Sequence, residues 1–151
     1  MHAIYVENYE SEPFMTAFKT YFGEISGRER NWPLLFRQMN AEREVTRAVL
    51  LQDGGTAVGF VLFCPLHLSC PFFTETYGYI RELWVASEYR RQGNGRLLLA
   101  LAEQDLSNRK IARVLLKADP RATGFYEKQG YTVSDTAVSE EGVMYTKHIS
   151  R

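Results

Sequence analysis

Three things are scarce in this sequence: long hydrophobic runs, an excess of charge of either sign, and cysteine. No apolar stretch approaches the roughly 20 residues that cross a bilayer, and residues 1–7 lack a signal-peptide pattern, so we expect a cytoplasmic protein with no membrane partner. Eighteen basic and 18 acidic residues cancel, which argues against a nucleic-acid-binding protein. Any anion site must therefore be local.

The two cysteines, Cys64 and Cys70, flank His67 in a Cys-x-x-His-x-x-Cys pattern. A zinc site needs a fourth ligand, and the sequence has no second pair to supply it. A disulfide does not suit the reducing compartment that we expect. We therefore predict two reduced thiols and no metal.

Hydrophobic residues make up 45% of the 151 residues and aromatic residues 13%, which predicts one packed domain over residues 1–151. Ser11 and Asn31 each precede a helix with proline in its first turn, and Asp53-Gly54-Gly55 is a hairpin signal. We predict strands at 3–6, 45–52, 56–63, 77–85, 113–118, 131–135 and 142–149, and helices from 12, over 31–44, over 93–108 and over 120–129. Residues 64–75 should form a loop and residues 139–142 a polar turn. This order indicates an α/β protein with a mixed sheet and helices on both faces.

The most informative segment, residues 90–95, reads Arg-Arg-Gln-Gly-Asn-Gly between a strand-like run and a helix-like run. A strand that turns through two glycines into a helix exposes backbone N–H groups at the positive end of the helix dipole, where phosphate binds well. A dinucleotide fingerprint is excluded because Leu98 stands where its third glycine should be, and the chain has no Gly-Lys-Ser/Thr for a Walker A loop. The alternative is an ordinary helix entry with solvated arginines.

A second motif spans residues 119–131. Asp119 can cap a helix that begins at Pro120, and Gly130 is a natural end for it. Helical spacing places four residues on one face of this helix: Ala122, Phe125, Tyr126 and Gln129.

Together the two motifs resemble the GCN5-related N-acetyltransferase (GNAT) family, which combines an Arg-x-x-Gly-x-Gly loop with a later Ala-x-x-x-Tyr-Glu-Lys-x-Gly-Tyr helix. The resemblance is strong over residues 77–135 and covers the rest in outline. It implies the acyl-CoA N-acyltransferase fold, a mostly antiparallel seven-stranded sheet in the order β-α-α-β-β-β-α-β-α-β-β. Two positions depart from the family pattern: Arg91 stands where glycine is usual, and Asp119 where asparagine is common.

By this resemblance the cosubstrate is acetyl-CoA, and no metal is needed. The amides of residues 92–96, with Arg90 and Arg91, would hold the diphosphate, and the strand ending at Val85 would pair with the pantetheine arm. A backbone N–H near residues 83–85 would polarise the thioester carbonyl. The coenzyme site is then expected to comprise Leu83, Trp84, Val85, Arg90, Arg91, Gln92, Gly93, Asn94, Gly95, Arg96, Asp119, Phe125 and Tyr126.

Two residues are predicted to move protons. Tyr126 is the candidate general acid for the leaving thiolate, since a thiol pKa near about 8.5 needs only a weak proton donor. Its alternative role is a buried anchor for the last helix. Glu82 is the candidate base for the amine, and strand alternation places it on one face with Trp84. Glu82 could instead pair with Arg81 or another arginine at the surface, and Tyr79, Glu75 and Glu88 are other candidate bases.

Residues 64–75, with Phe72, Phe73 and Glu75, look somewhat like the polyamine-type branch of the family. Aromatic rings and carboxylates suit an aliphatic amine, but also a peptide N-terminus or an aminoglycoside, and these aromatics could simply cover the sheet. The leading hypothesis is an acetyl-CoA-dependent N-acetyltransferase that acts on a small-molecule or peptide amine. The alternative is a non-catalytic acyl-CoA sensor of the same fold. Resemblance also suggests a homodimer.

Overall fold

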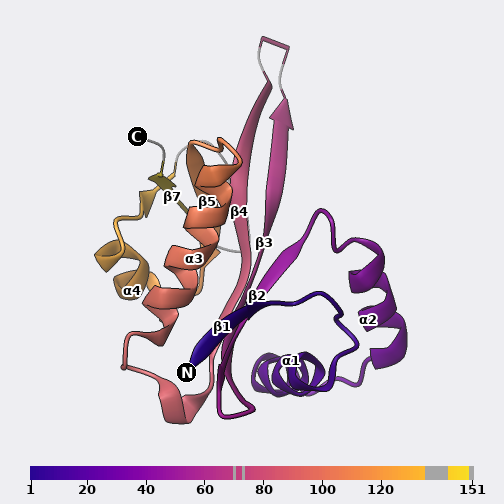
Figure 1. The fold of residues 1–151 in the computed structure, drawn as a ribbon. Helices are drawn as coiled ribbons and strands as arrows, with labels where there is room; N and C mark the ends of the chain where they lie inside the picture. Colours follow the sequence, from indigo (N-terminus) through magenta and orange to yellow (C-terminus); the bar gives the residue numbers. More distant parts are fainter. Residues whose placement is uncertain (70, 73, 135–142, 150–151) are drawn as a thin grey trace. The chain divides into compact units, whose positions relative to one another are not determined.

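The structure is a computed structural model that describes residues 1–69, 71–72, 74–134 and 143–149. The elements follow one another as β1 (His2–Tyr5), α1 (Glu12–Ile25), α2 (Trp32–Ala41), β2 (Arg47–Asp53), β3 (Thr56–Ser69), β4 (Thr74–Val85), the 3-10 turn η1 (Ser87–Tyr89), α3 (Asn94–Asn108), β5 (Arg113–Ala118), α4 (Thr123–Lys128), β6 (Thr132–Val133) and β7 (Val143–His148) (Figure 1). No helix in these ranges is long and apolar enough to cross a membrane.

The described strands form a seven-stranded sheet in the order β1-β2-β3-β4-β5-β7-β6. β1 runs antiparallel to β2, and β7 runs antiparallel to both β5 and β6. β4 and β5 are parallel, with pairs from Gly78–Val114 to Ile80–Leu116. The prediction of a mixed, mostly antiparallel sheet is confirmed, and so is the predicted order of helices and strands.

Local sequence signals correctly predicted several ends of helices and strands. Ser11 is the N-cap of α1, with proline in the first turn, as predicted. The side chain of Asn31 accepts a hydrogen bond from the Leu34 amide at 3.2 Å and so caps α2, which ends at Ala41 rather than near Glu44. β5 has the predicted bounds. The predicted turn at 139–142 lies outside the described residues.

The prediction that residues 64–75 form a loop is wrong, because β3 continues to Ser69 and β4 begins at Thr74. Two side chains of the extended β3, Leu66 and Leu68, pack against Tyr77, Leu115 and Met144. The prolines suggested a break, but alternating apolar side chains with a sheet to cover favour the strand. Phe72 is 92% exposed. Cys70 and Phe73 lie outside the described residues, so the prediction for the cysteine pair stays a prediction.

The chain divides into two compact units, which are described separately. The first unit comprises Met1–Leu62 and Glu82–Leu99, and the second comprises Phe63–Arg81 and Ala100–Arg151. The first unit has an aromatic core in which Phe60 of β3 contacts Phe14 and Phe18 of α1, with ring centroids 5.6 and 5.8 Å apart. Phe36 of α2 and Trp84 of β4 complete this core.

Helices cover both faces of β3 in the first unit. Phe60 faces α1 and α2, and the preceding residue, Gly59, faces the other way. A Cβ at Gly59 would overlap the Trp84 carbonyl oxygen and lie 3.2 Å from Cδ1 of Leu98 on α3. Glycine at this position therefore lets α3 and the end of β4 approach β3 closely.

In the second unit, Gly78 of β4 has the same role toward α3. A Cβ at Gly78 would overlap the side chain of Leu106, which is fully buried. The neighbouring strand β5 is buried along Val114, Leu115 and Leu116.

We predict that Gly59→Ala destabilises the protein by about 1–3 kcal/mol, because the new methyl group would displace the Trp84 carbonyl or the α3 helix. The measurement is guanidinium-induced unfolding followed by circular dichroism. Gly23→Ala is the matched control: Gly23 lies in α1 with no atom within 4 Å of an added Cβ. That variant should gain about 0.5–1 kcal/mol from helix propensity. Equal stability of Gly59→Ala and the parent protein would contradict the packing described here.

Candidate functional site

The segment between β4 and α3 has the strand–turn–helix form that the sequence indicated. After η1 the chain turns through two residues with positive φ, Arg91 at 60° and Gly93 at 85°, and α3 begins at Asn94. Arg91, Gln92 and Gly93 are exposed. Glycine suits the second of these positions, while Arg91 adopts the left-handed conformation despite its side chain.

Three side chains hold this turn to the chain before it. Asn94, which is only 7% exposed, donates from Nδ2 to the Tyr89 carbonyl oxygen at 2.9 Å. Gln92 Nε2 donates to the Glu88 carbonyl at 3.1 Å, and Arg90 Nε donates to the Val85 carbonyl at 2.8 Å. The turn is therefore fixed by contacts that leave its amides uninvolved.

The backbone N–H groups of residues 92–96 point to no acceptor within the described part of the chain. The first bond of the helical ladder runs from the Leu97 amide to the Gly93 carbonyl at 3.0 Å. N–H groups without intrahelical acceptors at the start of a 15-residue helix create a positive local field, which Arg91 and Arg96 reinforce with exposed side chains. This arrangement fits a phosphate or diphosphate group.

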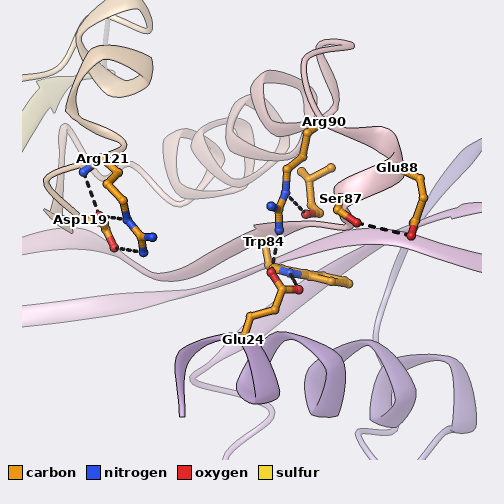
Figure 2. A network of polar contacts seen from close by, with 8 residues as sticks. Glu24, Trp84, Ser87, Glu88, Arg90, Asp119 and Arg121 are labelled. Carbon is orange, nitrogen blue, oxygen red and sulfur yellow. Dashed lines mark hydrogen bonds and ion pairs between the residues drawn. The ribbon is translucent and has the colours of Figure 1, made fainter. Parts of the chain in front are cut away.

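The sequence assigned Arg90 to the diphosphate, with a solvated arginine as the alternative, and the structure shows a contact that neither prediction included. Its NH2 group lies 2.7 Å from Glu24 Oε1, and the other oxygen of Glu24 accepts a hydrogen bond from Trp84 Nε1 at 3.0 Å. Figure 2 shows the Glu24 carboxylate reached by both the indole and the guanidinium. Part of the Arg90 charge is thus neutralised within the protein. No sequence signal pointed to Glu24, because it lies 66 residues from Arg90.

The end of β4 contacts α1 through two side chains. The phenol of Tyr21 donates a hydrogen bond to Oε2 of Glu82, and Trp84 bonds to Glu24, so Glu82 and Trp84 share the face that α1 covers. Strand alternation predicted that shared face. Leu83 and Val85 are half-buried. The sequence did not predict Tyr21 as a partner of Glu82.

Two of the other candidate bases, Glu75 and Glu88, already have hydrogen-bond partners. Glu75 accepts a hydrogen bond from the Tyr77 phenol at 2.8 Å, and burial is the main cause that raises the pKa of Tyr77. Glu88 accepts a hydrogen bond from Ser87 at 3.4 Å (Figure 2). Tyr79 is half-buried on β4.

The prediction that Asp119 caps a helix at Pro120 is wrong. α4 begins at Thr123, and the Asp119 carboxylate instead accepts a hydrogen bond from the Arg121 amide at 2.8 Å and pairs with the Arg121 guanidinium at 3.2 Å (Figure 2). The hydrogen bond from the Arg121 side chain is the main cause that lowers the pKa of Asp119. Residues 119–122 form a turn rather than the first turn of α4, because the Ala122 amide donates a hydrogen bond to the Asp119 carbonyl oxygen at 2.8 Å.

Tyr126 lies on α4, is 9% exposed, and packs edge-on against Phe125 and Tyr131, with ring centroids 5.1 and 5.9 Å apart. Its backbone carbonyl oxygen accepts hydrogen bonds from the amides of Gln129 and Tyr131, and these bonds cap the C-terminal end of α4. The phenol of Tyr131 donates to Glu103 at 2.7 Å, and burial, followed by the charge of Glu103, raises the pKa of Tyr131. Tyr131 is therefore a structural neighbour that fixes the Tyr126 ring.

The predicted site residues thus fall into two groups. The first unit brings together Glu82, residues 83–85 and residues 90–96, and the second contains Asp119, Phe125 and Tyr126. Among the described residues, no cluster of three or more His, Cys, Asp or Glu side chains could hold a metal ion.

Solved structures of known proteins share the fold of this chain. The structure superposes on a predicted acetyltransferase from Clostridium acetobutylicum with acetyl-CoA, with a TM-score of 0.76 and 15% identity, covering 91% of this chain and 94% of that one. It also superposes on the PaiA N-acetyltransferase of Thermoplasma acidophilum in complex with coenzyme A, with a TM-score of 0.64 and 16% identity, covering 98% and 99% of the two chains. At these identities the likeness shows the fold.

Two curated proteins are similar in sequence. L-ornithine N5-acetyltransferase NATA1 of Arabidopsis thaliana is 36% identical over 78 residues, which is 50% of this chain and 33% of that protein. The protein YyaT of Bacillus subtilis (strain 168), itself uncharacterized, is 29% identical over 75 residues, or 48% of this chain and 51% of that protein. The matches therefore span at most about half the length of these relatives. The model of the Acetyltransferase (GNAT) family matches residues 6–131, and the chain belongs to this family.

Proposed function

We propose that this protein transfers the acetyl group of acetyl-CoA to the amine of a small molecule or peptide by direct attack. The observation that carries the proposal is the row of backbone N–H groups at residues 92–96, which have no acceptor in the part of the chain that the structure describes. A coenzyme diphosphate fits this donor set because helix N-termini with exposed amides bind phosphate without a metal. The acetyl-CoA named with the Clostridium structure, and the coenzyme A named with the Thermoplasma structure, support it.

Acetyl-CoA supplies an activated thioester, and residues 83–85 would hold its acyl end. The β4–β5 ladder has its last pair at Ile80–Leu116, so residues 83–85 follow the point where that pairing stops. An extended ligand arm can pair with such a strand edge as an added strand does. A backbone N–H at residues 83–85 then donates to the thioester carbonyl oxygen, where negative charge develops.

Two side chains accept and donate the protons that move during acetyl transfer. Glu82 takes the proton that the amine loses as the N–C bond forms, and Tyr126 gives its phenolic proton to the sulfur as the C–S bond breaks. Support for Glu82 comes from its place on β4 directly before residues 83–85 and from its hydrogen bond to Tyr21. Support for Tyr126 comes from its place in the Tyr-Glu-Lys-x-Gly-Tyr motif at residues 126–131, since the burial of its ring on α4 fits the anchor role equally well.

The acceptor that we favour is a small aliphatic amine of the ornithine or polyamine type. The activity named for the Arabidopsis relative, N5-acetylation of L-ornithine, supports this class, since its matched part covers half of this chain. The Glu82 carboxylate beside the half-buried Tyr21 ring also suits an alkylammonium group, through charge and cation–π attraction.

Arg96→Glu tests the diphosphate site. The exposed side chain lies in the first turn of α3, so a carboxylate there suits the helix dipole but repels phosphate. Isothermal titration calorimetry with acetyl-CoA should show at least roughly tenfold weaker binding, equivalent to about 1.4 kcal/mol. Arg37→Glu, on the exposed side of α2, makes the same change in net charge and should bind acetyl-CoA like the parent protein. Equal affinity of the two variants would exclude the site at α3.

Tyr126→Phe tests the transfer chemistry. In an assay of coenzyme A release across a panel of amines, we expect kcat to fall about 100-fold, within the usual range for loss of an acid–base group, with the acetyl-CoA Kd unchanged. Tyr145→Phe removes a phenol from the same unit whose OH donates to Glu127 at 3.3 Å, and it should retain kcat. Saturable acetyl-CoA binding by the parent protein with no turnover of any amine would contradict the transferase and support the sensor.

A further inference from the structure

α1 and β4 exchange two hydrogen bonds of opposite direction. Tyr21 of α1 donates to Glu82 of β4, and Trp84 of β4 donates to Glu24 of α1 at 3.0 Å. On the helix, Tyr21 and Glu24 are three residues apart, which corresponds to a rise of about 4.5 Å along its axis. On the strand, Glu82 and Trp84 are two residues apart, which corresponds to about 6.7 Å. The two bonds therefore fix both the position of α1 along β4 and the side chains that face each other.

Contacts with neighbouring rings hold the Tyr21 ring in place independently of the hydrogen bond that its hydroxyl makes. Its centroid lies 5.8 Å from Phe18 and 5.5 Å from Phe60, and both contacts are edge-on. Phe60 is fully buried and Phe18 is 9% exposed. The aromatic core of the first unit therefore determines where the Tyr21 hydroxyl lies, and the Glu82 carboxylate is oriented by a rigid donor.

We propose that Tyr21 is a positioning residue for Glu82, an inference that rests on the proposed function in which Glu82 accepts the proton of the amine. A phenol that donates to a carboxylate favours the charged form of that carboxylate, which is the form that can take up a proton. Two further ionisable groups of the first unit near this contact, Glu24 on α1 and Arg90 after η1, form an ion pair with each other. The neighbours from α2 and β3 in this core, Phe36 and Phe60, are apolar.

Tyr21→Phe removes the donor and keeps the ring. The carboxyl titration of Glu82 is followed by carbon-13 NMR of protein labelled at the glutamate carboxyl carbons, and Glu82→Gln identifies the resonance because it removes it. We expect the midpoint of this titration to rise by about 0.5–1 pH unit in Tyr21→Phe. The acid limb of kcat/KM for the amine should move by the same amount, with the acetyl-CoA Kd within about twofold of the parent value. An unchanged midpoint in a folded variant would overturn the inference.

Tyr9→Phe is the matched control. The Tyr9 phenol is buried in the same unit, donates to the Thr46 carbonyl oxygen at 2.9 Å, and has its pKa raised by burial to about 12. Its loss should lower the melting temperature and leave the Glu82 midpoint and the acid limb unchanged. A similar shift in Tyr9→Phe would show that any loss of core packing alters Glu82, and would overturn the specific role of Tyr21.

Failure of this inference is distinguishable from failure of the proposed function. If Glu82→Gln retains full turnover, the base assignment is wrong, whereas a shifted NMR midpoint in Tyr21→Phe would still show that Tyr21 sets the charge of Glu82. If Glu82→Gln abolishes turnover but Tyr21→Phe moves neither the midpoint nor the acid limb, the base assignment stands and Tyr21 has no positioning role.

Discussion

The first turn of α3 has backbone N–H groups with no acceptor among the described residues, and the proposed chemistry depends on them. Every helix begins with N–H groups that lack intrahelical acceptors, and many helices satisfy them with a side-chain cap. Here the side chain at the start of the helix, Asn94, is turned back to the Tyr89 carbonyl, and Gln92 is bonded to the Glu88 carbonyl. Side chains hold the turn in place while its amides have no acceptor among the described residues, which is the combination that an anion site requires.

The ion pair with Glu24 gives Arg90 a structural role in addition to any contact with phosphate. The ion pair is partly exposed, with 48% of the Arg90 side chain and 41% of the Glu24 side chain accessible, so it contributes at most about 1 kcal/mol to stability. Its consequence is geometric: one carboxylate joins α1 to the Trp84 indole and to the first residue of the turn. The attraction for a diphosphate then depends more on the amides, the dipole, Arg91 and Arg96.

Patterns that act over a few residues predicted much of this molecule. The strand at 113–118, the Ser11 and Asn31 caps, and the turn into α3 all follow from neighbours in sequence. The predictions failed where a local signal competed with another interaction. The prolines at 64–75 predicted a loop, but packing against the sheet extends β3 to Ser69. Asp119 forms a turn with Arg121 instead of capping α4. The bond between Tyr21 and Glu82 joins residues 61 positions apart, so only the folded chain reveals it.

The central claim is that a coenzyme diphosphate binds to the amides of residues 92–96. The most direct measurement is a nitrogen-15 NMR titration of the labelled protein with coenzyme A. The account predicts that the backbone amide resonances of Gln92, Gly93, Asn94, Gly95 and Arg96 shift most and saturate with one common Kd. Saturable shifts elsewhere with these five amides unmoved, or no shifts at all at millimolar coenzyme, would contradict it.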